Sequence, residues 1–347
     1  MAEKRRVTQK DVALRAGVSQ AIVSTVLTGK EGNIRINQET RNRVLQAMRE
    51  LGYTPNIAAQ SLAGGMSRIL GVFTYDSVFP TNRKDFYYPF LEGIEEEASR
   101  SDFDLLLHTR TVGEGNRRSI YRGGTNRLLV ADGTLLLGFM DPAHREELAQ
   151  VIAEGHPCVF IGRREIPGGN LSYVTADYTA ATWQLVEHLL ALGHRKFVYL
   201  AEPKQQESAL DRRQGYRETG VGEVVSLEPG EFTLACFKRL LRSGVSALVL
   251  ENDRFARRLQ GHMAELGLEA PRDLSYVVLG DPLSGEEDGA PSWTSFEIPR
   301  QAMGREAVRL LAEHLLGGLA FPRQLSLPCI LRLGNSSGPV PQTQGWG

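Results

Sequence analysis

The chain has 347 residues, 41% of them hydrophobic and 23% charged, which predicts a soluble globular protein with two or three domains. No apolar run approaches the length of a membrane span, MAEKRR lacks the apolar region of a signal peptide, and three widely spaced cysteines suit neither a metal site nor a disulfide framework. The formal net charge is −1, but residues 1–65 contain ten Lys or Arg residues and only five acidic ones. This basic segment is typical of one that binds a polyanion, although a solvated basic surface would have the same composition. We expect a cytoplasmic protein with no cofactor, no metal and no membrane contact.

The segment Thr8–Leu27 reads as two short helices joined by a tight turn. Thr8 and Asp11 have the spacing of a capping box, Gly17 suits the end of the first helix, and Ser19 can cap the second. Apolar residues at helical spacing would face inward: Val12, Ala13, Ala16, Ile22, Val23, Val26 and Leu27, with Val18 between the helices. The other face of the second helix carries Gln20, Ala21, Ser24 and Thr25. These small polar side chains suit a DNA major groove, but an ordinary helical hairpin uses the same pattern.

A third helix is predicted over Asn37–Leu51, with Asn37 as its cap and Val44, Leu45, Met48 and Leu51 as its apolar stripe. The following segment, Ile57–Ala63, lies between Pro55 and Gly64-Gly65. A helix of two turns is not stable alone in water. We therefore expect a linker that folds only against a partner surface.

From Ile69 onward, apolar runs alternate with amphipathic helical stretches. The expected strands are Ile69–Phe73, Phe103–Leu107, Thr134–Leu137, Cys158–Ile161, Phe197–Leu200, Ala247–Leu250 and Tyr276–Leu279. The expected helices are Pro89–Ser101, His144–Glu154, Ala180–Leu192, Leu234–Ser243, Phe255–Leu266 and Gly304–Leu316. This order predicts an α/β body of parallel sheets with helices on both faces, in two similar halves that bind a ligand in the cleft between them. We expect the Gly/Pro/Gln-rich residues from Ser336 to Gly347 to form a flexible tail without a coiled coil.

Short motifs occur in a fixed order along the chain. In the N-terminal part they are Lys10-Asp11-Val12-Ala13, Ala16-Gly17-Val18-Ser19, Val23-Ser24, Val26-Leu27, Glu39-Thr40-Arg41, Leu51-Gly52-Tyr53, Pro55-Asn56, Ala58-Ala59 and Ser61-Leu62. In the body they are Leu70-Gly71-Val72, Gly93-Ile94-Glu95, Ala131-Asp132-Gly133, His188-Leu189, Leu192-Gly193-His194-Arg195, Ser208-Ala209, Arg212, Gly215-Tyr216, Asn252-Asp253, Asp281 and Met303-Gly304. With these motifs the chain resembles the lactose-repressor (LacI/GalR) family of bacterial transcription regulators over nearly its whole length.

The resemblance implies a helix-turn-helix headpiece (1–54), a hinge helix and linker (55–66), a two-lobed effector-binding and dimerisation domain similar to periplasmic binding proteins (67–335) and the tail (336–347). It implies a homodimeric repressor that binds a palindromic operator under the control of a small ligand, which we expect to be a sugar. The chain departs from the family pattern at a few positions: Thr25, Thr28, the longer loop Gly29–Ile36, Gly162, Asp281-Pro282 and Ile298. These departures affect the operator sequence and the class of effector rather than the architecture.

The resemblance also assigns DNA-contacting residues. The expected base contacts are Gln20, Ala21 and Thr25, and the expected phosphate contacts are Thr8, Ser19, Arg35 and Asn37. In the hinge, the expected minor-groove residues are Asn56, Ala59 and Leu62, with Leu62 as a wedge between base steps. The alternatives are helix residues without a role and a Leu62 that packs against its own subunit.

The expected effector-binding residues are Phe86, Tyr87, Arg212, Phe232, Asn252 and Asp281. Arg212 and Asp281, expected in loops after strands of the second half, can donate to and accept from neighbouring sugar hydroxyls, and the aromatic rings can stack on a sugar. The alternative for Arg212 and Asp281 is a structural ion pair or surface charges without a role in binding.

No catalytic constellation is present: the sequence has no G-x-S-x-G elbow, no metal-ligand spacing, and no Walker loop or G-x-G-x-x-G after the first strand. We therefore expect a protein that is not an enzyme. Two other classes stay open. A periplasmic-type solute-binding protein would have a similar body but a signal peptide and no basic headpiece, and a cleft enzyme would need a catalytic set.

Overall fold

The computed structural model describes residues 7–28, 36–54, 66–75, 84–109, 118–281 and 292–341. The chain divides into two compact units, the headpiece Met1–Ile69 and the body Leu70–Gly347. The predicted hinge segment Ile57–Ala63 and the predicted phosphate contact Arg35 lie outside the described residues. Among the helices within those ranges, none is both long and apolar enough to cross a membrane.

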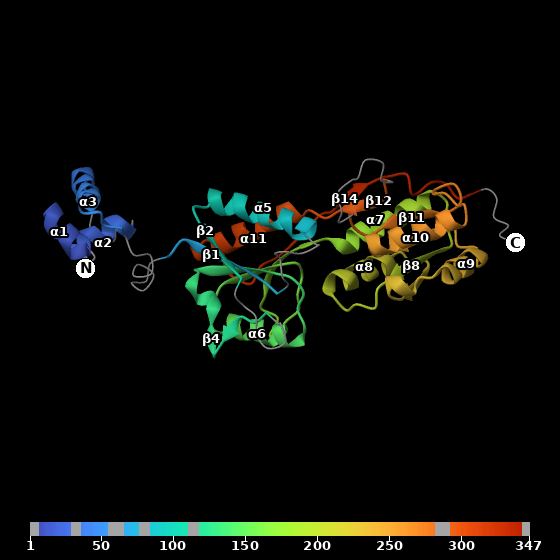
Figure 1. Ribbon diagram of the computed structural model, residues 1–347, viewed down its shortest axis with the longest axis horizontal. Coiled ribbons are helices and arrows are strands. Elements are labelled where there is room, and N and C mark those ends of the chain that lie inside the picture. The colour runs from blue at the N-terminus through green and yellow to red at the C-terminus, as the bar shows by residue number, and fades with distance from the viewer. Residues whose placement is uncertain are drawn as a thin grey trace, which may run out of the picture. The chain divides into compact units, whose positions relative to one another are not determined.

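The described part of the headpiece contains three helices, the blue part of Figure 1: α1 (Gln9–Ala16), α2 (Gln20–Thr28) and α3 (Gln38–Leu51). The predicted capping box is present, because the Thr8 side chain accepts from the backbone N–H of Asp11 and the Asp11 carboxylate accepts from the N–H of Thr8. Gly17 ends α1 in the left-handed conformation with φ of 65°, which glycine adopts without steric cost. A tight turn therefore leads from α1 into α2, as the sequence predicts.

A small apolar core holds the three helices together. Its buried members are Val12, Ala13, Ala16, Val23, Val26, Val44 and Ala47, and the partly buried residues packed against it include Val18, Ile22, Leu27, Met48 and Leu51. The predicted stripe of α3 is wrong at one position, since Leu45 is 40% exposed. Val44, Ala47, Met48 and Leu51 already follow the i, i+3, i+4, i+7 spacing of one helix face, and Leu45 points about 100° away from it.

The body contains two six-stranded sheets, each the centre of one lobe. The first lobe has the strand order β13-β7-β6-β5-β1-β2, formed by β1 (Ile69–Thr74), β2 (Asp104–His108), β5 (Gly133–Leu137), β6 (Cys158–Ile161), β7 (Ser172–Ala176) and β13 (Gln324–Leu327). The second lobe has the order β14-β12-β11-β10-β8-β9, formed by β8 (Phe197–Ala201), β9 (Glu223–Ser226), β10 (Ala247–Leu250), β11 (Ser275–Val278), β12 (Thr294–Glu297) and β14 (Ile330–Arg332). A short hairpin of β3 (Tyr121–Arg122) and β4 (Thr125–Asn126) leads into the 3₁₀ helix η2 (Arg127–Val130). Strands β5, β6, β8 and β10 are buried along their whole length, which explains why they are continuous apolar runs in the sequence.

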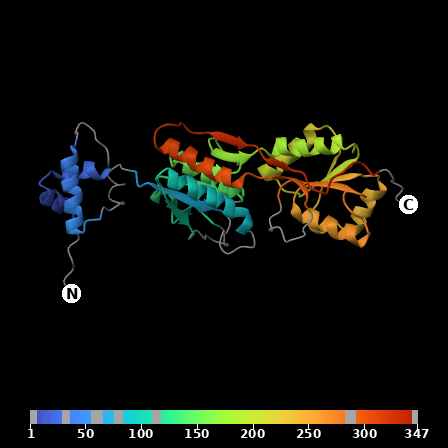
Figure 2. The same ribbon diagram turned by 90° about the horizontal axis from the view of Figure 1, so that it is seen from above.

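Helices cover both faces of each sheet. In the first lobe, α5 (Lys84–Arg100) packs on α11 (Arg300–Leu315), α11 lies against β5, β6 and β7, and α6 (Pro142–Ala153) covers the opposite face (Figure 1). In the second lobe, Figure 2 shows α7 (Tyr178–Ala191) and α8 (Glu207–Glu218) on one face and α9 (Leu234–Arg242) and α10 (Asp253–Glu265) on the other. The predicted α/β architecture with two parallel sheets is confirmed, with β14 as an antiparallel addition beside β12.

Within the described residues, the chain passes between the two lobes three times: from β7 to α7, from β12 to α11, and from β13 to β14. Each of these connections is only a few residues long. Short connections of this kind allow two lobes to rotate against each other while each sheet stays intact.

The predicted flexible tail is wrong for its first residues. Ser336 is buried, and its Oγ donates to the carbonyl of Tyr276 and accepts from the N–H of Thr294, both at 2.8 Å. The carbonyl of Gly338 accepts from the buried side chains of His194 and Ser275. These hydrogen bonds satisfy buried polar groups, so the start of the tail is a fixed part of the second lobe.

Candidate DNA-binding and effector sites

The predicted base-reading face of α2 is accessible. Gln20 and Ala21 are exposed, and Thr25 is half-buried, with its Oγ1 donating to the carbonyl of Ala21 at 3.0 Å. The amide of Gln20 donates to Gln9 Oε1 at 3.5 Å, a long bond that leaves the rest of the amide accessible. The core of the headpiece therefore holds α2 with this polar face turned outward.

The three predicted phosphate-contacting residues within the described part are all helix caps. The side chains of Thr8, Ser19 and Asn37 accept from backbone N–H groups in the first turns of α1, α2 and α3 respectively, and all three residues are exposed. Helix N-termini carry partial positive charge and backbone N–H groups that suit a phosphate. The caps thus point to three places where an anionic backbone can approach the headpiece.

In the body, Arg212 lies on helix α8 and not in the loop that the sequence predicts. Its Nε donates to the carbonyl of Leu279 and its Nη1 to that of Ser208, both at 2.9 Å. Its guanidinium lies over the ring of Tyr178, with 4.1 Å between Cζ and the ring centroid. Backbone carbonyls and the ring of Tyr178 thus hold the guanidinium of Arg212 in place. The structural ion pair that the sequence left open exists for Asp281, and its partner is Arg300.

Asp281 lies directly after β11, as predicted, and forms an ion pair with Arg300 at the start of α11. Its Oδ1 also accepts from the N–H of Ile298 at 3.2 Å. Arg300 in turn lies over the ring of Phe86, with 5.1 Å between Cζ and the centroid. Phe86, Asp281 and Arg212 therefore gather around the short segment that follows β11, at the edge where ligands bind in open α/β sheets.

Asn252 caps α10 directly after β10. Its Oδ1 accepts from the N–H groups of Arg254 and Phe255, while its Nδ2 donates to Glu202 Oε1 at 2.6 Å. Glu202 follows β8 and was not among the predicted site residues. Burial acts to raise the pKa of Glu202, but hydrogen bonds from Lys204 and Asn252 and the charge of Arg254 lower it overall, so the carboxylate stays ionised.

Two of the predicted aromatic contacts are not accessible. Phe232 is completely buried in the core of the second lobe, edge-on to Phe237 and Phe255, so the prediction that its ring face stacks on a ligand is wrong in this structure. Tyr87 is also buried, and 5.0 Å separates the centroid of its ring from that of Phe86. Phe232 is a large apolar side chain, and such side chains are usually buried; here it packs in the same core cluster as Phe237 and Phe255.

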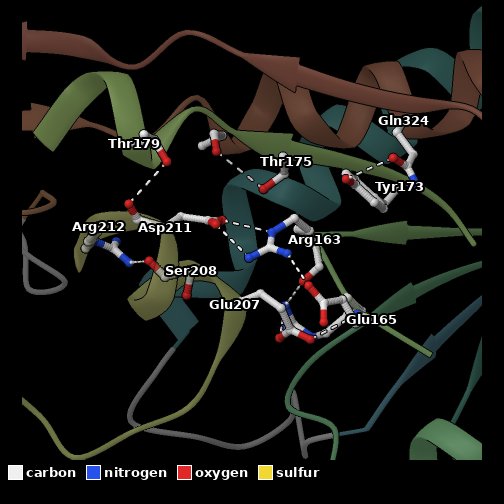
Figure 3. A network of polar contacts seen from close by, with 12 residues as sticks. Arg163, Glu165, Tyr173, Thr175, Thr179, Glu207, Ser208, Asp211, Arg212 and Gln324 are labelled. Carbon is white, nitrogen blue, oxygen red and sulfur yellow. Dashed lines mark hydrogen bonds and ion pairs between the residues drawn. The ribbon is translucent and has the colours of Figure 1, made fainter. Parts of the chain in front are cut away.

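A cluster of charges that the sequence does not predict joins the two lobes, and Figure 3 shows its members Arg163, Asp211 and Glu207. Arg163, which follows β6, pairs with Asp211 of α8, and Arg145 of α6 pairs with Glu207 of α8. Both acidic residues neighbour positions already predicted from the Ser208…Arg212 motif. Among the described residues, no group of three or more His, Cys, Asp or Glu side chains is arranged to hold a metal ion.

A helix-turn-helix headpiece is followed by a two-lobed body in which Arg212 and Asp281 lie around the segment after β11. This combination is typical of a ligand-binding transcriptional regulator. Residues 8–56 match the family of bacterial regulatory proteins, lacI family, and residues 76–223 match the periplasmic binding proteins and sugar binding domain of the LacI family. Residues 186–337 match a periplasmic binding protein-like domain. The chain belongs to the LacI family and is a DNA-binding transcriptional regulator, which confirms the resemblance seen in the sequence.

Full-length relatives support this assignment. The HTH-type transcriptional regulator CelR of Thermobifida fusca is 29% identical, over 97% of this chain and 100% of its own. The HTH-type transcriptional repressor MelR of Bacillus subtilis is 26% identical, over 95% of this chain and 97% of its own. A structure described as a CelR–cellobiose complex has a TM-score of 0.60 at 25% identity, covering 95% of this chain and 100% of that one. The lac repressor dimer bound to operator shares the fold, with a TM-score of 0.66 at 24% identity, covering 96% and 100%.

Proposed function

We propose that this protein is a cytoplasmic, homodimeric repressor whose operator binding is controlled by a sugar. The observation that carries the proposal is the pairing of an outward-facing recognition helix, α2, with a body whose inner edge gathers Phe86, Arg212 and Asp281. A DNA reader and a ligand site on one chain give a means of regulation, since binding at one site can shift the equilibrium at the other.

On DNA, two headpieces would occupy the half-sites of a palindrome, as symmetric dimers do. Gln20, Ala21 and Thr25 would contact base edges, while Thr8, Ser19 and Asn37 would fix the headpiece on phosphates. Arg35 and the hinge residues Asn56, Ala59 and Leu62 remain predictions from the sequence. The basic charge of residues 1–65 supports this assignment, because phosphate neutralisation dominates DNA affinity.

For the effector, the side chains favour a polyhydroxylated ligand. Arg212 supplies N–H donors, Asp281 supplies acceptors, Asn252 supplies both, and Phe86 offers an aromatic surface. The neighbours of these residues hold them in place, which lowers the entropic cost of binding. The match of residues 76–223 to a sugar-binding domain and the cellobiose named in the CelR structure support a sugar as the class of ligand.

Self-association is supported by the outermost strand of the first sheet. Leu105, Leu106 and Leu107 of β2 are each more than a third exposed, and β2 pairs only on its inner side within the described part of the sheet. An exposed apolar edge strand is a liability in a monomer and is usually covered. We propose that a second copy of the chain covers this edge. We propose no catalytic activity, in keeping with relatives that are regulators.

The proposal is tested by incubating the purified full-length protein with labelled genomic fragments and sequencing those that it retains. A regulator enriches a few fragments that share a palindrome, and a panel of sugars that includes cellobiose then identifies the one that changes retention. A solute-binding protein would bind a sugar without retaining any fragment. Turnover of a sugar without fragment retention would instead indicate a cleft enzyme.

A further inference from the structure

We propose that five charged side chains at the boundary between the lobes act as an ionic clasp that fixes the angle between them. We call this set the interlobe cluster; it consists of Arg145, Arg163 and Arg164 of the first lobe and Glu207 and Asp211 of the second. Figure 3 shows Arg163, Glu207 and Asp211 of this cluster. The inference concerns the lobe angle and does not depend on DNA binding, whereas its consequence for regulation rests on the proposed function.

The pair between Arg163 and Asp211 has the geometry of a strong ion pair. Nη2 of Arg163 lies 2.6 Å from Oδ1 of Asp211, and Nε lies 3.2 Å from Oδ2, so two parallel hydrogen bonds join the planar groups. Both side chains are mostly buried, at 23% and 19% exposure. A bidentate pair that is screened little by water restricts distance and orientation together.

Glu207 forms the second half of the cluster and is 3% exposed. Its Oε1 lies 2.6 Å from Nη1 of Arg145 and accepts the backbone N–H of Glu165 at 3.0 Å, while its Oε2 lies 3.8 Å from Nη1 of Arg164. Burial acts to raise the pKa of Glu207, but these partners hold it below the ordinary value. The carboxylate is therefore ionised at neutral pH, and separating the lobes would leave a charge without its partners.

The cluster connects directly to the candidate effector site. On helix α8, Glu207 directly precedes Ser208 and Asp211 directly precedes Arg212. Arg212 donates a hydrogen bond to the carbonyl of Ser208. Any rotation of α8 relative to the first lobe must break the cluster and displaces Arg212 at the same time. An effector that changes the lobe angle must therefore break the ion pairs of the cluster. The stronger these ion pairs are, the more binding free energy the effector has to supply.

The test measures the lobe-to-lobe distance in the full-length protein. Spin labels are attached through keto amino acids introduced at Glu146 on α6 and Lys238 on α9, which are exposed and lie in different lobes. Pulsed electron–electron double resonance then gives the distribution of distances between the two labels. We expect one narrow distribution for the parent protein, a broader or shifted one for Arg163→Asp, and a return to the parent distribution for the charge-swapped pair Arg163→Asp with Asp211→Arg.

Arg332→Asp is the matched control, because it removes the ion pair with Glu297, whose members both lie in the second lobe. It should leave the distance unchanged. Asp211→Asn provides a milder break of the clasp if Arg163→Asp fails to fold, as judged by circular dichroism. An unchanged distribution in a folded Arg163→Asp or Asp211→Asn variant overturns the proposal. So does a broadening that the charge swap fails to reverse, or one that Arg332→Asp reproduces. Loss of fragment retention in the parent protein would count against the proposed function without touching this result.

Discussion

The guanidinium of Arg212 stacks on the ring of Tyr178, 4.1 Å from its centroid. Tyr178 is the first residue of α7, directly after the connection in which the chain passes from the first lobe to the second. The residue best suited to hold an effector is therefore in contact with one of the three segments about which the lobes can turn. Under the proposed function, ligand binding and lobe movement would share this pair of side chains.

Replacing Arg212 with alanine should abolish the effector response and leave operator binding nearly intact. The substitution removes donors at the candidate site and the stacking on Tyr178, while the headpiece is untouched. Fluorescence anisotropy on a retained fragment, with and without the effector, measures both properties. Arg217→Ala on the same helix, an exposed position, is the control and should respond normally. A variant that responds at parental effector concentrations would remove Arg212 from the site.

Gln20→Ala should change the sequence preference of the protein more than its affinity for random DNA. A bidentate contact between an amide and one base contributes about 1–3 kcal/mol of discrimination at that base pair. Affinities for operators substituted at single positions reveal the loss. Gln46→Ala, which removes an exposed amide of α3, should leave the preference unchanged. Equal weakening on every sequence would instead identify Gln20 as a phosphate contact or a structural residue.

Leu62→Ala should lower the affinity for the operator and leave non-specific affinity almost unchanged. Leu62 lies outside the described residues, and the prediction rests on its short segment between Pro55 and Gly64-Gly65. A wedge that unstacks a base step and bends the duplex contributes on the order of 1–3 kcal/mol only where the step opens easily. Binding and bending assays on the operator and on random DNA test this. Parental bending by the variant would contradict it.

Two glycine substitutions should differ sharply in their cost. At Gly17 a Cβ would meet no atom within 4 Å, so Gly17→Ala carries only the strain of φ 65°, about 1–2 kcal/mol on the headpiece. At Gly93 a Cβ would collide with the backbone of Gln301 in α11. Gly93→Ala should therefore force α5 and α11 apart. It should lower the free energy of unfolding of the body by more than Gly17→Ala lowers that of the headpiece. Thermal unfolding of the full-length variants measures both effects. If the body of Gly93→Ala unfolds at the same temperature as that of the parent, the close contact between the two helices is refuted.

Much of the fold is predictable because its signals are local. The caps at Thr8 and Asn37 and the stop at Gly17 mark the headpiece helices, and buried strands such as Cys158–Ile161 appear as apolar runs. Helix α8 was missed because its sequence, ESALDRRQGYRE, is mostly polar, and packing against α7 rather than an apolar stripe stabilises it. Strand β13 was missed because it is half polar and lies at a sheet edge.

The candidate sites were predictable only in part. Residue types and family motifs locate Gln20, Arg212 and Asp281, but not the partners that hold them. Arg163 and Asp211 are 48 residues apart, and nothing in either local sequence indicates that the fold of two lobes brings them together. The burial of Phe232 likewise depends on the side chains around it and not on its position in a motif.

The central claim is that the headpiece makes this chain a sequence-specific DNA-binding protein. The most direct test is a titration of the full-length protein against a retained palindrome and against the same fragment with both half-sites scrambled, between about 50 and 200 mM salt. We predict that affinity for both fragments falls steeply with salt and that the palindrome is bound at least about 10³-fold more tightly at physiological salt. Equal affinity for the two fragments, or affinity that does not change with salt, would contradict the account.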